Sequence, residues 1–307
     1  MSATSDYPLS TLTGLRGAAR AVALARDYLA LTRPRVLSLV LFTAPPALVL
    51  GHAGWPEPAT ALGVVLGAAL VGGGCGALNA WLESARDARM ARTRDRPLPA
   101  GRLEPRQALT FGLLVSALGL LVLLALGGWL AALIGALTLV HYVVVYTLWL
   151  KPRTPQNIVI GGAAGAAAPL IADAAADGRL GIWGLVLFAI IFVWTPPHFW
   201  AIALYRKREY AAAGFPMLPA VLGDAATRRR MLAYALALIP LTLLPWLGGV
   251  LGPVYAALAL LSGAWFAGSI VRAMRARTSR ADRRVFAVSI QYLALLFGAM
   301  LVELALR

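Results

Sequence analysis

Long apolar runs, separated by short polar connections, account for most of the 307 residues of this chain. The hydrocarbon core of a bilayer is about 30 Å thick, so a helix that crosses it needs roughly 20 apolar residues. By that criterion the sequence predicts nine membrane-spanning helices, at residues 36–53, 60–82, 107–126, 129–149, 157–177, 183–204, 231–250, 253–272 and 285–305. Because lipid offers no hydrogen bonds to the backbone, each crossing segment is expected to be helical. The pattern therefore predicts an all-α polytopic membrane protein.

Two of the polar connections, 83–106 and 205–230, are long and charged, and they follow the second and the sixth predicted span. An even number of spans between two similar connections is typical of parallel internal repeats. We therefore expect nine transmembrane helices around a central cavity, with two four-helix repeats and one additional helix. Hydrophobic residues make up 60% of the sequence and charged residues 13%, which leaves no room for a sizeable soluble domain.

The segment before the first span, residues 1–35, lacks the apolar core and cleavage site of a signal peptide. Leu15, Val22 and Leu29 share one face of a predicted helix in this segment, a pattern typical of helices that lie on a membrane surface. We therefore expect a cytoplasmic N-terminal segment with an interfacial helix at 1–35 and a single membrane domain at 36–307.

The net charge of +15 is distributed very unevenly along the chain. Of the 28 Lys and Arg residues, 26 precede the first predicted span or lie in alternate connections, all of which would face the same side of a membrane. The positive-inside rule then predicts a multi-pass protein of the cell inner membrane with a cytoplasmic N-terminus and an external C-terminus. The basic face is expected to contact anionic lipid. No base-stacking aromatic residues alternate with these charges, which argues against nucleic acid as a partner.

An amide and two carboxylates leave the membrane together at the end of the second predicted span. Asn79, Glu83 and Asp87 are spaced four residues apart, so a helix presents all three on one face. Oxygen ligands of this kind suit Mg²⁺, which completes its shell with water and substrate phosphates. Ordinary ion pairs at a solvated helix end would explain Glu83 and Asp87 as well. Asn79 favours a binding site, because an amide one turn deeper in an apolar span needs a partner.

Basic residues follow these acids closely. Guanidinium groups can hold diphosphate oxygens in pairs of hydrogen bonds, so a metal diphosphate is expected between the acids and the arginines. The candidate diphosphate-binding residues are Arg86, Arg92, Arg94, Arg96, Lys151, Arg153 and Lys207. Anchoring by the positive-inside rule would account equally well for Lys151 and Arg153.

The sixth predicted span and the connection after it contain a second group of polar residues. His198 follows Pro196 and Pro197, a pair that predicts a break in the helix, and Tyr205 and Glu209 come about two and about three turns later. Ionisable groups at membrane depth are functional candidates, which makes His198 a candidate for the acceptor side of the site. The alternative is that His198 hydrogen-bonds a backbone carbonyl freed by the prolines.

Asp173 and Asp177 form another acidic pair four residues apart, at the outward end of the fifth predicted span. This position is across the bilayer from the arginines. The sequence therefore predicts an external surface pair and no part in the candidate site.

Several stretches together resemble the UbiA-type intramembrane prenyltransferases, and in particular their heme-type branch. They are DYLALTRPRVLSLVLFTA at 27–44, the Asn79 segment through RTRDRPLPAGR, YTLWLKPRTPQNIVIGGAAGAAAPLI, and WTPPHFWAIALYRKREYAAAGFPMLP. The similarity is specific from residue 27 to about 219 and generic beyond it. Glu83 stands where the superfamily more often has Asp, and Arg208 stands where an acid is common.

The resemblance implies roles for the candidate residues. Asn79, Glu83 and Asp87 would be catalytic and would hold Mg²⁺ with the prenyl diphosphate. Glu209 would be a further metal ligand from a reduced second motif, and His198, Tyr205 and Glu209 would lie on the acceptor side. The implied reaction transfers a C15 farnesyl group from farnesyl diphosphate to the 2-vinyl group of heme B, and water addition then gives heme O. Heme B would be a substrate and not a cofactor, and a heme A synthase would act downstream.

Three other functions remain open from the residues alone. A secondary transporter would share the spans and the buried polar groups, although its charges are expected near the bilayer midplane. A prenyltransferase acting on an aromatic acid would need a cation for the acceptor carboxylate. A non-enzymatic assembly factor for heme proteins would not need the Asn79, Glu83 and Asp87 set.

Overall fold

The computed structural model describes residues 17–51 and 54–306, and every regular element in that part of the chain is a helix. Leu15, the last two residues of the first predicted span and Arg307 lie outside the described residues. The helices are α2 (Ala18–Leu31), α3 (Pro34–Phe42), α4 (Ala44–Gly51), α5 (Pro58–Asp87), α6 (Pro105–Val122), η1 (Leu123–Gly127), α7 (Gly128–Val140), η2 (His141–Leu150), α8 (Asn157–Ala166), α9 (Ala168–Asp177), α10 (Ile182–Tyr205), α11 (Lys207–Ala212), α12 (Leu218–Leu222), α13 (Asp224–Leu247), α14 (Pro253–Ala276) and α15 (Ser279–Ala305).

Eight helical segments in the described chain are long and apolar enough to cross a membrane, and one of them, Pro105–Leu150, has 46 residues. This long segment reverses at Gly128, whose φ of 83° only glycine adopts readily. A Cβ added at Gly135 would lie 2.8 Å from Leu123 Cδ1. These two residues would be about 18 Å apart on one straight helix, so α7 folds back against η1. The long segment therefore supplies two crossings, in agreement with the nine predicted spans.

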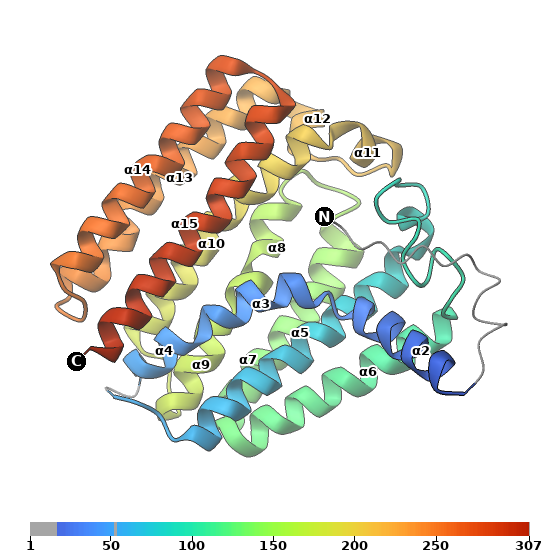
Figure 1. The fold of residues 1–307 in the computed structure, drawn as a ribbon, viewed down its shortest axis with the longest axis horizontal. Helices are drawn as coiled ribbons and strands as arrows, with labels where there is room; N and C mark the ends of the chain where they lie inside the picture. The colour runs from blue at the N-terminus through green and yellow to red at the C-terminus, as the bar shows by residue number, and fades with distance from the viewer. Residues whose placement is uncertain (1–16, 52–53, 307) are drawn as a thin grey trace.

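The helices form a bundle whose basic connections gather at one end. In Figure 1 the connections 88–104, 151–156, 206–223 and 277–278 lie along the upper right of the molecule, and the opposite ends of the helices lie along the lower left. The outer surface keeps large exposed apolar side chains, such as Leu114, which is 65% exposed. Such a surface suits lipid, and the chain is a multi-pass membrane protein.

Small residues let α5 and α6 approach one another closely. A Cβ added at Gly74 would lie 2.0 Å from Ser116 Oγ, and one at Gly112 would lie 3.2 Å from the backbone nitrogen of Leu78. Glycine permits this close packing of membrane helices without side-chain clashes. The close contact fixes the course of α5, which carries the Asn79, Glu83 and Asp87 set.

Helix α2 precedes the first span and has exposed apolar residues, including Val22 and Leu29. On its other side Asp27 is buried and accepts a hydrogen bond from Arg102 Nε at 3.0 Å. The described part of α2 is therefore helical and amphipathic, and its position on a membrane surface stays a prediction. The Asp27–Arg102 pair also fastens α2 to the charged connection after α5.

Two sequence-based interpretations are wrong. Helix α10 continues through Pro196 and Pro197, so the predicted break is absent, because packing against neighbouring helices supports prolines within membrane helices. Asp173 is buried and not on the surface. Its Oδ2 accepts the backbone N–H of Gly181 at 2.5 Å, which satisfies a donor in the turn before α10.

Candidate active site

The predicted set at the end of α5 is deeply buried. Asn79 is 0% exposed, Glu83 4% and Asp87 5%, although the last turn of α5 borders a charged connection. We call these three residues the acidic stripe. Buried polar groups of this kind need partners, and the partners come from three other segments of the chain.

The first partner is Arg33, in the turn between α2 and α3. Its Nη2 donates to Asn79 Oδ1 at 2.5 Å. The Arg33 backbone has φ 54° and ψ 55°, a left-handed conformation that side-chain-bearing residues rarely adopt and that is still less favourable before a proline. Strain of this kind persists only where the surrounding structure enforces it, and it concentrates at functional sites. The turn aims the guanidinium at the acidic stripe.

The second partner is the π-helix η2, which has wider turns than an α-helix. Its winding is visible in Thr147 Oγ1, which donates to the Tyr142 carbonyl five residues earlier at 2.8 Å, and in Lys151 N, which bonds the Tyr146 carbonyl at 2.9 Å. Thr147 Oγ1 in turn accepts from Asn79 Nδ2 at 3.0 Å. Both ends of the Asn79 amide are therefore held. π-Helical segments are rare and often occur at functional sites.

Each carboxylate of the stripe faces a cation. Lys151 Nζ lies 2.6 Å from Glu83 Oε1 and 2.7 Å from Oε2, and Arg96 Nη1 lies 2.7 Å from Asp87 Oδ2. Phe215, from the connection after α11, lies beneath two of the local cations, with its ring centroid 4.9 Å from Lys151 Nζ and 5.2 Å from Arg86 Cζ. Cation–π contacts of this kind hold cations without neutralising them. The basic groups remain available to an anion.

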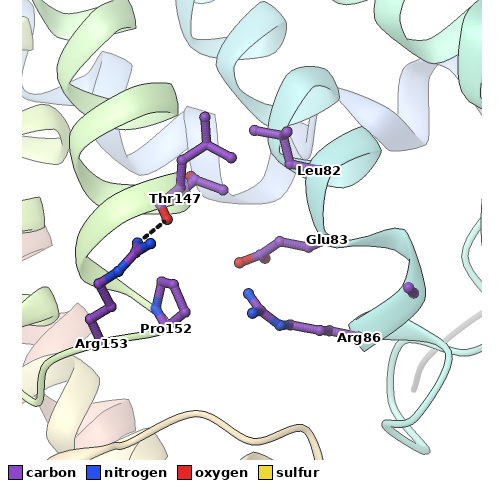
Figure 2. A pocket seen from close by; sticks show the side chains of 8 residues that line it. Leu82, Glu83, Arg86, Thr147, Pro152 and Arg153 are labelled. Atoms are coloured by element: carbon purple, nitrogen blue, oxygen red, sulfur yellow. Dashed lines mark hydrogen bonds between the residues drawn. The ribbon is translucent and has the colours of Figure 1, made fainter.

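A cavity of about 530 Å³ opens between the end of α5 and the end of η2. Figure 2 shows Glu83 and Arg86 extending into it from α5, opposite Thr147 and Arg153. Leu82, Ala85, Leu148 and Pro152 complete the lining. The cavity thus combines an apolar wall with two arginines and a carboxylate, which suits a ligand with a charged head and an apolar tail.

The pKa values of two arginines report on the local charge. Burial alone would lower the pKa of Arg33, but Tyr142, Glu83, Asp87 and Tyr146 together raise it above its ordinary value. The pKa of Arg96 is lowered by burial and by the nearby charges of Arg33 and Arg92, although Asp87 opposes this shift. Burial is the main cost to the charged form of Arg96, and a bound anion beside the guanidinium would offset that cost.

The structure brings some of the other predicted diphosphate ligands to the cavity and leaves others apart. Arg86 and Arg153 line it, and Arg153 Nη1 also donates to the Leu148 and Trp149 carbonyls at the end of η2. Arg92 is close enough to Arg96 to affect its pKa. Arg94 is exposed and pairs with Asp95 at 3.9 Å, and Lys207 pairs with Asp224 at 2.8 Å.

The predicted acceptor residues form a separate cluster between α10 and α15. His198 is buried, and its Nδ1 lies 2.7 Å from Ser289 Oγ, so it does not bond a carbonyl of its own helix. Tyr205 lies against Phe286, with ring centroids 6.1 Å apart. Glu209 pairs with Arg206 at 2.7 Å, and among the described residues it forms no hydrogen bond or ion pair with the acidic stripe. Glu209 as a metal ligand therefore stays a prediction.

The sequence reasoning missed four residues of the site. Arg33 and Thr147 bond Asn79 of the stripe, and Tyr146 and Phe215 lie against Lys151, all through contacts between distant or neighbouring segments that spacing alone does not reveal. An arginine directly before a proline at the start of an apolar span is the one feature that could have indicated Arg33. His141, also unexplained by the sequence, has its Nε2 2.9 Å from the Ile160 carbonyl and joins η2 to α8.

The residues of the stripe fit a magnesium ion in their chemistry. The described residues contain no cluster of three His, Cys, Asp or Glu side chains, so an ion here would rest on two carboxylates and one amide. Mg²⁺ is commonly held by few protein oxygens and completes its shell with water and phosphate. Asp87 Oδ1 accepts no hydrogen bond from any described residue and is one oxygen free for a metal.

Comparisons with known proteins identify the family of this chain. The model of the UbiA prenyltransferase family matches residues 40–298. The protoheme IX farnesyltransferase of Parvibaculum lavamentivorans is 48% identical over 283 residues, which cover 91% of this chain and 89% of that protein. The protoheme IX farnesyltransferase of Erythrobacter litoralis is 46% identical over 283 residues, which cover 91% of this chain and 92% of that protein.

Solved structures share the fold. A structure from work on digeranylgeranylglyceryl phosphate synthase superposes with a TM-score of 0.77 at 16% identity, covering 92% of this chain and 99% of that one. A UbiA homologue from Archaeoglobus fulgidus bound to DMAPP and Mg²⁺ superposes with a TM-score of 0.64 at 17% identity, covering 90% of this chain and 99% of that one. With the family model matching most of its length, the chain belongs to the UbiA prenyltransferase family.

Proposed function

We propose that this enzyme transfers the farnesyl group of farnesyl diphosphate to the 2-vinyl group of heme B and forms heme O. The observation that carries the proposal is the acidic stripe, buried among Arg33, Lys151 and Arg96 beside the cavity between α5 and η2. The relatives that are 46–48% identical over most of their length are protoheme IX farnesyltransferases, which supports heme as the acceptor.

The reaction breaks the bond between farnesyl C1 and the diphosphate oxygen. C1 forms a bond to the terminal carbon of the vinyl group, the adjacent carbon bonds the oxygen of water, and that water loses one proton to leave a hydroxyl group. Diphosphate leaves more readily when its developing charge is stabilised by fixed positive groups. Arg86, Arg96 and Lys151 would supply these charges, and the apolar wall of the cavity would exclude water from the allylic carbon.

Asn79, Glu83 and Asp87 would hold Mg²⁺, as the A. fulgidus homologue bound to DMAPP and Mg²⁺ suggests for the family. The bound ion would neutralise the leaving diphosphate. Lys151 and Arg96 already neutralise the two carboxylates and could turn toward the diphosphate once a cation shares that role. This exchange would let the same residues serve both the empty and the loaded site.

The proposed orientation puts the N-terminus and the acidic stripe in the cytoplasm and the C-terminus outside the inner membrane. Reporter fusions after residues 101 and 225 are expected to be active on the cytoplasmic side and those after 55 and 250 on the outer side, because the basic connections gather at one end of the bundle. A cytoplasmic signal after residue 55 would contradict the orientation. Anionic lipid would bind the same basic face, and heme O would pass to a downstream heme A synthase.

The direct test is to incubate the purified protein with heme B, farnesyl diphosphate and Mg²⁺ and to measure the mass of the porphyrin product. The expected product is heme O. Transfer to an aromatic acid in place of heme B under the same conditions would overturn the proposed acceptor.

His198→Ala is expected to shift the Soret band of bound heme and to raise the KM for heme B, while the KM for farnesyl diphosphate stays unchanged. The physical reason is that a neutral imidazole nitrogen can ligate heme iron. His141→Ala is the matched control, because the His141 ring bonds a backbone carbonyl. An unchanged Soret band with intact heme affinity in His198→Ala would remove His198 from the heme site.

A further inference from the structure

Two arginines from distant parts of the chain converge on one aromatic ring at the basic end of the bundle. Arg206, which follows α10, has its Cζ 5.5 Å from the Tyr205 ring centroid, and Arg283, in the first turns of α15, has its Cζ 5.4 Å from the same centroid. Neither arginine is among the diphosphate candidates. Both belong to the cluster between α10 and α15.

Aromatic rings continue from this pair into the membrane. Tyr205 lies 6.1 Å from Phe286, Phe286 lies 4.8 Å from His198, and His198 stacks on Trp194 at 4.3 Å. Tyr205 and His198 are seven residues apart on α10, which places them on one face about 10 Å apart along the helix. The cluster is therefore cationic at the membrane surface and aromatic below it.

The hydrogen bonds of Ser289 define the state of His198. The Ser289 hydroxyl donates to the Phe286 carbonyl at 2.7 Å, so the bond between His198 Nδ1 and Ser289 Oγ places the imidazole proton on Nδ1. The lone pair of Nε2 is then free, and no described residue donates a hydrogen bond to it. A free Nε2 lone pair is the feature with which histidine binds a metal centre.

The positive charge of the pair is only half compensated. Arg206 pairs with Glu209 at 2.7 Å, whereas Arg283 is exposed and forms no ion pair with a described residue. The start of α15 is nevertheless held firmly. Asp282, next to Arg283, forms two hydrogen bonds with Arg228 of α13, at 2.8 and 2.7 Å, and both side chains are buried. Arg283 is thus an uncompensated cation on a fixed element.

We propose that Arg283 and Arg206 bind the propionate carboxylates of the porphyrin acceptor, whose apolar face lies along Phe286 toward His198. This inference rests on the proposed function for the identity of the acceptor. The porphyrin is planar and apolar, with two carboxylates at one edge and iron at its centre. The two carboxylates match the two arginines at the surface end of the cluster, and the iron matches the His198 nitrogen about two helical turns below. The Arg206–Glu209 pair is partly exposed, so Arg206 can exchange the Glu209 carboxylate for a propionate at little cost.

The test compares heme B with its dimethyl ester, which lacks both carboxylate charges but keeps the macrocycle and the iron. Binding to the purified protein is followed by Soret titration. Arg283→Gln is expected to weaken heme B binding about tenfold, equivalent to ~1.4 kcal/mol, and to leave the dimethyl ester unaffected. The Arg206→Gln/Arg283→Gln double variant is expected to bind the acid and the ester equally. Arg284→Gln, a change of an exposed arginine at the next position of α15, is the matched control and should match the wild type.

Arg283→Lys distinguishes loss of charge from poor folding. It keeps the positive charge, so it is expected to keep most of the preference for heme B over the dimethyl ester. Equal weakening of both ligands by Arg283→Gln, or no weakening of either, would overturn the inference. The proposed function is assessed separately by the heme O mass in the wild type. If the wild type binds heme B better than the dimethyl ester but makes no heme O, only the proposed function is contradicted. If the wild type makes heme O and Arg283→Gln keeps the full preference for heme B over the ester, only the inference is contradicted.

Discussion

Asp87→Asn is expected to lower the rate of farnesyl transfer by roughly 10²- to 10³-fold, the range typical of removing one well-placed electrostatic group from a catalytic site. The amide has nearly the shape of the carboxylate but lacks its charge. The substitution therefore removes a proposed metal ligand from the acidic stripe and the counter-charge of Arg96, which lies 2.7 Å away. It should also leave Arg33 and Arg96 to repel one another more strongly, since their charges already interact.

The measurement is a titration of Mg²⁺ and farnesyl diphosphate with each protein. In the wild type, EDTA should abolish turnover and excess Mg²⁺ should restore it, whereas Asp87→Asn should need more of both ligands and should not recover the full rate. Asp95→Asn is the matched control, because Asp95 is exposed and pairs only loosely with Arg94. Wild-type rates for Asp87→Asn at all Mg²⁺ concentrations would mean that Glu83 and Asp87 are only an ion-paired helix end.

The sequence predicts the helical part of this site well, because one periodicity governs it. Residues four apart on an α-helix share a face, and Asn79, Glu83 and Asp87 are indeed buried together at the end of α5. The spans follow equally simply from the thickness of a bilayer. Even the reversal at Gly128 is implied by the length of the apolar segment, because 46 residues exceed one crossing.

The rest of the site depends on structure that no simple period encodes. Thr147, in the π-helix η2, contacts Asn79, and Lys151, directly after η2, contacts Glu83, and these pairings between distant segments depend on how η2 packs against α5. The local sequence disfavours the left-handed backbone of Arg33, so this conformation depends on tertiary contacts. The error at Pro196 and Pro197 has a similar origin, because local propensity predicts a break that packing against other helices removes. The two predicted four-helix repeats stay a prediction.

Arg33→Ala is expected to reduce both stability and activity, and its effect on the rate should approach that of Asp87→Asn. Asn79 Oδ1 would lose its donor while remaining 0% exposed, and leaving a buried polar group unpaired costs about 1–3 kcal/mol. Glu83 and Asp87 would also lose a positive charge that interacts with both carboxylates, since these two residues help to raise the pKa of Arg33. The thermal midpoint and the rate of farnesyl transfer measure the two effects separately.

A double-mutant cycle with Asn79→Ala separates the Arg33–Asn79 contact from general loss of charge. If Arg33 acts through Asn79, the coupling in the free energy of transfer should be on the order of 0.5–3 kcal/mol, and Arg33→Lys should restore charge without restoring the amide geometry. Arg35→Ala, an exposed arginine two residues later, should leave the rate unchanged. Additive effects of Arg33→Ala and Asn79→Ala would show that the two side chains contribute independently. The strained turn before Pro34 would then have to be explained by the packing of α2 and α3 alone, since the guanidinium would no longer account for it.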